Sequence, residues 1–132
     1  MRRLEVKDEQ AIGPAHGPYS QGLVSGNLFF TGVIGSCGEE GKLPESVYDQ
    51  TIQIFANTKN LLERAGGSLK DIANVTVFLL NISDFDEMNR AYAECLTERP
   101  LPARATVAVK EMLEGVKVEM VITAILPDKE EG

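Results

Sequence analysis

The sequence predicts an α+β fold, in which short strands form one sheet and two amphipathic helices cover one of its faces. Three observations predict it. Apolar residues recur at helical spacing over residues 47–65 and again over residues 84–97. Residues 73–80 are apolar on nearly both faces, as in a central strand. Residues 116–126 alternate like a strand with one continuous apolar face.

Length and charge narrow the class of protein. The chain has 132 residues, and we expect one domain over residues 1–132. Its net charge of −7 disfavours nucleic acids and anionic lipids, which bind through clustered lysine and arginine. No stretch approaches the ~20 apolar residues of a membrane helix, and charged residues interrupt any signal-like segment near the start. We therefore expect a soluble, cytoplasmic protein with no membrane partner.

The first part of the chain predicts strands joined by loops. Residues 4–6 predict a short first strand, and residues 13–22 predict a loop because their prolines and glycines oppose a helix. Residues 23–24 and 28–30 flank the turn-type cluster Ser25-Gly26-Asn27 and predict a hairpin.

Two helices follow, each with start and stop signals. Residues 47–65 predict a helix with Ser46 as its N-cap and Gly66-Gly67 at its end. Residues 84–97 predict a second helix, with Ser83 as the N-cap. Two helices can cover only one face of the sheet.

The last strand has apolar groups on both faces. Val121 and Ile125 lie opposite its main apolar face, and Glu119 shares their side. No further helix is available to cover that side, so we expect an oligomer with Glu119 near the subunit interface.

Arg104 and Glu119 are the candidate functional pair. Arg104 begins one strand-like run and Glu119 lies in the next, so we expect adjacent elements to present both to a small anionic substrate. Arginine stays charged and matches a carboxylate with two parallel hydrogen bonds, whereas glutamate can exchange a proton. On residue types alone, an ion pair between Arg104 and Glu119, or a solvated Glu119, remains open.

Other reactive side chains carry weaker signals. Cys37 and Cys95 have no metal-ligand spacing and are expected to be free thiols. His16, the only histidine, is expected to be an exposed turn residue, with a general-base role left open. The acidic tail 128–131 is expected to be solvated.

Four motifs occur in a recognisable order: GPYSQG at 17–22, FTG at 30–32, LPAR at 101–104 and VKVE at 116–119. Together they identify a resemblance over essentially the whole chain to the RidA (YjgF-like) family of reactive intermediate deaminases, also described as L-PSP endoribonucleases or translation initiation inhibitors. The resemblance implies a chorismate-mutase-like α+β fold with a mixed sheet covered on one face by two helices. It also implies a homotrimer with a central barrel and sites between subunits.

The resemblance further implies hydrolysis of 2-aminoacrylate and 2-iminobutanoate to 2-oxo acids and ammonia, as a 2-iminobutanoate/2-iminopropanoate deaminase without metal or organic cofactor. Arg104 matches the arginine that binds the substrate carboxylate, and Glu119 matches the glutamate that positions or activates water. The other substrate-binding positions that it implies are Tyr19, Thr31, Gly32, Asn89 and Thr106. Many members carry cysteine where this chain has Thr106, so we expect that position to act through its backbone.

Two other function classes stay open. A non-catalytic binding or regulatory module for 2-oxo acids would need Arg104 but not Glu119. An endoribonuclease or translation inhibitor has the least support, because the chain has a net charge of −7 and no pair of histidines for acid and base work.

Overall fold

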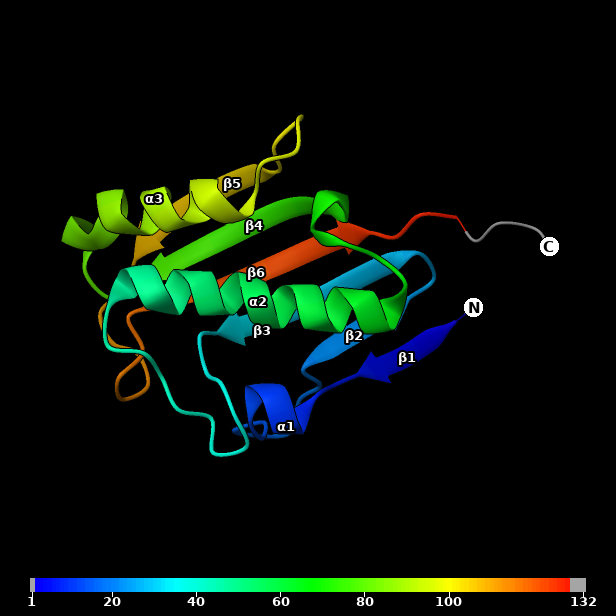
Figure 1. Ribbon diagram of the computed structural model, residues 1–132, viewed down its shortest axis with the longest axis horizontal. Helices are drawn as coiled ribbons and strands as arrows, with labels where there is room; N and C mark the ends of the chain where they lie inside the picture. The colour runs from blue at the N-terminus through cyan, green and yellow to red at the C-terminus, as the bar shows by residue number, and fades with distance from the viewer. Residues whose placement is uncertain (1, 129–132) are drawn as a thin grey trace.

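The structure, a computed structural model, describes residues 2–128 and contains one six-stranded sheet with its helices on one face (Figure 1). The strands are β1 (Arg3–Val6), β2 (Gly22–Ser25), β3 (Leu28–Ile34), β4 (Ile72–Leu79), β5 (Ala103–Ala108) and β6 (Val118–Ile125). The helices are α1 (Glu9–Ile12), α2 (Val47–Ala65) and α3 (Phe85–Cys95), with 3₁₀ turns η1 (Leu69–Asp71) and η2 (Ile82–Asp84). Residues 129–131 of the expected acidic tail lie outside the described residues.

The sheet is mixed, as predicted. Its strand order is β1-β2-β3-β6-β4-β5, and β4 and β5 are its parallel pair. Strands β4 and β5 are parallel because the chain crosses over through α3 before it re-enters the sheet. The predicted β2–β3 hairpin is confirmed, with Gly26 at a φ of 61° in its turn.

Helix α2 confirms the predicted boundaries and caps. The Ser46 hydroxyl accepts a hydrogen bond from the Asp49 N–H at 2.9 Å, and Gly66 ends the helix in the left-handed region with a φ of 91°. Its apolar face packs on the sheet, where Ile54, Phe55 and Leu62 join the fully buried Phe29. Burying each such side chain contributes roughly 1.5–3 kcal/mol, so this layer contains the core.

The start of the second helix differs from the prediction. Helix α3 begins at Phe85 rather than Asp84 and ends at Cys95 rather than Thr97, and the predicted N-cap Ser83 lies exposed inside η2. The 3₁₀ turn explains the difference. The N–H of Phe85 already donates to the carbonyl of Ile82, so backbone groups replace a side-chain cap.

Helix α1 was not predicted. It is a single turn in which the Asp8 carboxylate accepts a hydrogen bond from the Ala11 N–H at 3.1 Å. A turn this short leaves no helical periodicity in the sequence.

Helices α2 and α3 lie on one face of the sheet (Figure 1), and among residues 2–128 no helix or strand covers the opposite face, as predicted. Val121 is 46% exposed and Ile125 is 51% exposed on this face, while their neighbours Met120 and Ile122 are fully buried. Leu28 and Phe30 of β3 are exposed too. The oligomer inferred from this open face stays a prediction.

Among residues 2–128, none of the helices combines the length and the apolar character needed to span a membrane.

Removing the N-cap of α2 tests this account of its boundary. Ser46→Ala deletes the acceptor for the Asp49 N–H and should lower the free energy of unfolding by about 1 kcal/mol. Ser83→Ala is the matched control and should change it by no more than a few tenths of a kcal/mol. Urea denaturation followed by circular dichroism measures both values. Equal losses in the two variants would contradict the assignment of the caps.

Candidate functional site

Five of the seven predicted site residues line two hollows. The first, the Glu119 hollow, has a volume of about 410 Å³, and its lining includes His16, Tyr19, Ser20, Gly32, Leu113 and Glu119. The second, the Arg104 hollow, has a volume of about 550 Å³, and its lining includes Asn89, Tyr92, Thr97, Arg99, Leu101 and Arg104. Each hollow therefore holds one member of the candidate pair.

Within one chain, Arg104 and Glu119 do not meet, and the prediction that adjacent elements present them together is wrong. Strand β4 lies between β5, which carries Arg104, and β6, which carries Glu119. Arg104 pairs with the fully buried Val75 and so lies on the face covered by the helices. Glu119 alternates with the fully buried Val118 and Met120 and so lies on the open face. The crossover through α3 and the alternation of side chains separate them.

Arg104 rests against two aromatic rings of α3. Its guanidinium carbon lies 4.7 Å from the ring centroid of Tyr92 and 5.7 Å from that of Phe85. Both distances are within the range of cation–π attraction. Among residues 2–128 the ion pairs are Lys42–Glu40 and Arg64–Asp8, so Arg104 has no carboxylate partner there. Without a carboxylate partner among those residues, its guanidinium can receive an external anion.

Two buried hydroxyls lie on the same covered face as Arg104. Among the described residues, neither Tyr92 Oη nor Thr106 Oγ1 has a hydrogen-bond partner. Burial raises the pKa of the Tyr92 phenol, and the positive charge of Arg104 partly offsets this, although their contact does not reach hydrogen-bond geometry. Thr106 pairs with the buried Val77 and lines neither hollow, so its substrate-binding role stays a prediction.

Glu119 is a half-buried carboxylate. Burial raises its pKa above the ordinary 4.5, because leaving water penalises the charged form. It therefore holds its proton to a higher pH than a surface glutamate does, which suits a group that exchanges protons with a substrate.

The loop that lines the Glu119 hollow is held by its own hydrogen bonds. Tyr19 is 52% exposed, and its hydroxyl accepts a hydrogen bond from the His16 N–H at 2.9 Å. The buried Thr31 donates its hydroxyl to the Gln21 carbonyl at 2.6 Å, so it supports the loop from beneath and lies outside the Glu119 hollow. At Gly32 a Cβ would meet no atom within 4 Å, which leaves open space beside Glu119.

Gln21 is a structural contributor that the sequence analysis missed. Its buried carboxamide accepts a hydrogen bond from the Asp8 N–H at 2.8 Å and donates one to the Gly13 carbonyl at 2.7 Å. It thus anchors the segment that leads into the His16–Tyr19 loop. Gln21 belongs to the GPYSQG motif, but a single glutamine carries no sign of such a role in a sequence.

His16 and Leu113 also line the hollow that contains Glu119. A general-base role for His16 was left open by the sequence, in which nothing singles out Leu113. Across residues 2–128, no cluster of three His, Cys, Asp or Glu side chains is arranged to hold a metal ion, and Cys37 and Cys95 are free thiols.

Comparison with known proteins supports the predicted resemblance. The endoribonuclease L-PSP family profile matches residues 9–126. A RutC family protein of Aquifex aeolicus is 42% identical over 123 residues, which are 92% of this chain and 98% of that protein. Reactive Intermediate Deaminase A, chloroplastic, of Arabidopsis thaliana is 36% identical over 126 residues, which are 94% of this chain and 67% of that protein.

A solved structure has the same fold at similar identity. The crystal structure of E. coli TdcF with bound serine superposes with a TM-score of 0.85 at 33% identity, over 94% of this chain and 99% of that one. The chain therefore belongs to the endoribonuclease L-PSP family, the RidA/YjgF-like family that its four motifs predicted.

Proposed function

We propose that the protein hydrolyses reactive enamine and imine acids, such as 2-aminoacrylate and 2-iminobutanoate, to 2-oxo acids and ammonia. The observation that carries this proposal is the unpaired Arg104 guanidinium, held on aromatic rings at the edge of a hollow. A relative named Reactive Intermediate Deaminase A supports the reaction class.

Arg104 and Glu119 can divide the chemistry between them. Arg104 binds the substrate carboxylate and fixes the orientation of the imine. Glu119 accepts a proton from water as the water oxygen bonds to the imine carbon, and the C=N electron pair moves to nitrogen. Glu119 then returns the proton to nitrogen, which gives a carbinolamine. Glu119 next moves the proton of the new hydroxyl to the amino nitrogen, so the C–N bond breaks as the carbonyl forms and ammonia leaves.

We propose that the site forms between subunits of a homotrimer. Arg104 and Glu119 lie on opposite faces of one sheet, so a second copy is needed to bring an Arg104 hollow to a Glu119 hollow. The exposed Phe30, Val121 and Ile125 share the open face with Glu119 and supply an apolar surface for that contact. Formation of this contact between subunits would also remove water from around Glu119.

Binding of small carboxylates without turnover is the second candidate. This function is favoured because Tyr92 and Phe85 of the same chain position Arg104. Arg104 can therefore bind an anion without Glu119. The serine named in the TdcF structure is a small carboxylate of this kind.

Cleavage of RNA has no comparable support, despite the name of the family. A net charge of −7 opposes contact with a phosphate backbone, and the chain has one histidine rather than a pair. An RNA-binding role would require affinity that falls steeply with salt.

Replacement of Arg104 tests the proposed reaction. The native protein should speed release of ammonia and 2-oxobutanoate from 2-iminobutanoate made in situ by a threonine dehydratase. Arg104→Ala should lower kcat/KM at least about 30-fold, because the substrate carboxylate loses its charged partner. Arg90→Ala removes an exposed arginine of α3 that lies against Tyr48, and it should leave kcat/KM unchanged. If the native protein gives no acceleration yet binds 2-oxobutanoate through Arg104, the binding module is the correct function.

Mixing two impaired variants tests the site between subunits. Arg104→Ala and Glu119→Gln should each have strongly reduced activity alone. Refolding them together from urea should restore part of the activity, because some interfaces then combine an intact Arg104 with an intact Glu119. Each variant refolded alone is the control. Failure of a co-refolded mixture that is shown to contain both chains would contradict a shared site.

The pH profile tests the role of Glu119 as a base. Its carboxylate form is needed to accept a proton, so kcat/KM should rise as the pH rises through its pKa. Because burial raises that pKa, the midpoint of the acid limb should lie above 4.5. Glu119→Gln should remove this limb and lower activity by about 10²–10⁴-fold. An acid limb that persists unchanged in Glu119→Gln would assign the base to another group.

A further inference from the structure

The Arg104 hollow is positively charged in an otherwise acidic protein. The chain has 20 acidic and 13 basic residues. The lining of this hollow nevertheless includes both Arg99 and Arg104, and it includes no aspartate or glutamate. Its other polar side chains, Asn89, Tyr92 and Thr97, are neutral. Because no acidic side chain lines the hollow, the two arginines leave it with a positive charge that an anionic ligand can neutralise.

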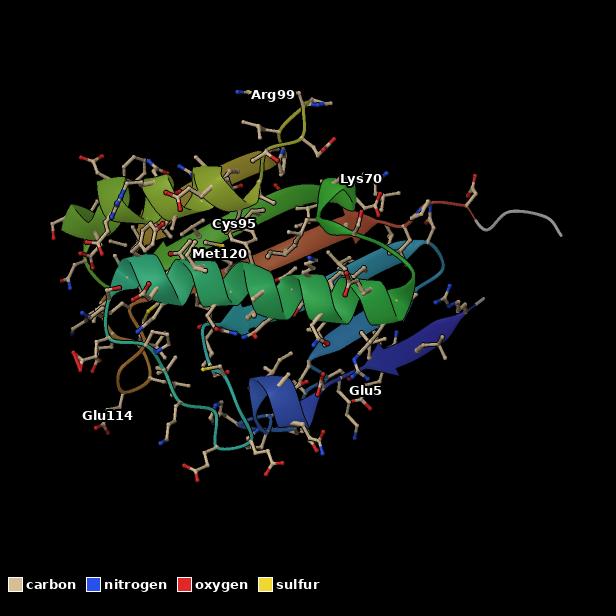
Figure 2. The ribbon with its side chains drawn as sticks, in the orientation of Figure 1. Glu5, Lys70, Cys95, Arg99, Glu114 and Met120 are labelled. Carbon is tan, nitrogen blue, oxygen red and sulfur yellow. The ribbon has the colours of Figure 1, made fainter. Side chains whose placement is uncertain are left out.

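Arg99 lies at the tip of the loop between α3 and β5 (Figure 2). It is exposed, and among residues 2–128 it forms no ion pair. Asp71 and Glu98 line a neighbouring hollow of about 420 Å³ that Arg99 also borders, but neither lines the Arg104 hollow. Arg99 is therefore a second unpaired guanidinium at the border of the hollow that contains Arg104.

The size of the hollow exceeds the needs of a four-carbon acid. A volume of about 550 Å³ falls within the usual range of ligand pockets, which is about 300–1,000 Å³. A monocarboxylate that pairs with Arg104 would fill a small part of this space and leave Arg99 without a partner. A longer acid with a second carboxylate would engage both guanidinium groups, and its methylene groups would lie against Leu96 and Leu101.

We propose that Arg99 is a specificity-determining residue that selects 2-imino acids with a second carboxylate, such as 2-iminoglutarate. Arg104 binds the carboxylate next to the imine, and Arg99 binds the distal one. This inference rests on the proposed deaminase function and names its preferred substrate class. Oxidation of the amine of an acidic amino acid is the class of reaction that supplies such an imine.

Two imines compared in one assay test the proposal. 2-Iminoglutarate is made in situ by an L-glutamate oxidase, 2-iminobutanoate is made by a threonine dehydratase, and formation of each 2-oxo acid is measured above its spontaneous rate. Arg99→Gln should lower kcat/KM for 2-iminoglutarate about threefold to tenfold, because an exposed cation is partly screened by solvent. It should leave kcat/KM for 2-iminobutanoate unchanged. Arg99→Lys should recover part of the loss, and Arg90→Gln is the control of equal charge change.

Equilibrium binding separates this proposal from the proposed function. Calorimetry with 2-oxoglutarate and 2-oxobutanoate should give tighter binding of the dicarboxylate to the native protein, and Arg99→Gln should abolish that difference. If the native protein hydrolyses neither imine but keeps this preference, the deaminase function fails and the role of Arg99 stands. If 2-iminobutanoate is hydrolysed and Arg99→Gln affects both acids equally or neither, the role of Arg99 is overturned and the deaminase function stands.

Discussion

The register of β6 is the constraint on which the rest of the structure depends. This strand pairs with β3 on one side and β4 on the other, and its alternation sends Met120, Ile122 and Ala124 into the core beneath the helices. The same alternation places Glu119 on the open face. A slip of one residue would bury the carboxylate and expose the core side chains, so the packing energy of the fold also fixes the position of the candidate base.

Local patterns in the sequence were sufficient for the elements that make local contacts. The spacing of apolar residues in α2 and its Ser46 cap depend on neighbours within a turn or two, and both are confirmed. The Ser83 cap was wrong because a backbone turn at Ile82 already satisfies the first N–H of α3. The open face could be predicted because two helices cannot cover both sides of a sheet.

The pairing of strands that are distant in the chain could not be predicted from the sequence. Arg104 and Glu119 lie in consecutive strands of the chain, yet β4, which precedes both strands in the chain, separates them in the sheet. The motifs in the sequence were enough to single out both residues. That they lie on opposite faces of the sheet follows only from the register of the paired strands. Gln21 shows the same limit, because its partners Asp8 and Gly13 are defined only once the loop is folded.

The support of Arg104 by Tyr92 and Phe85 has a consequence for the cost of ligand capture. An unrestrained arginine carries about 2 kcal/mol of rotamer entropy, part of which is lost when it binds. Here the aromatic rings restrict the side chain before any ligand arrives, and among residues 2–128 no ion pair of Arg104 has to be broken first. Capture of an anion at this position therefore requires little reorganisation of the protein.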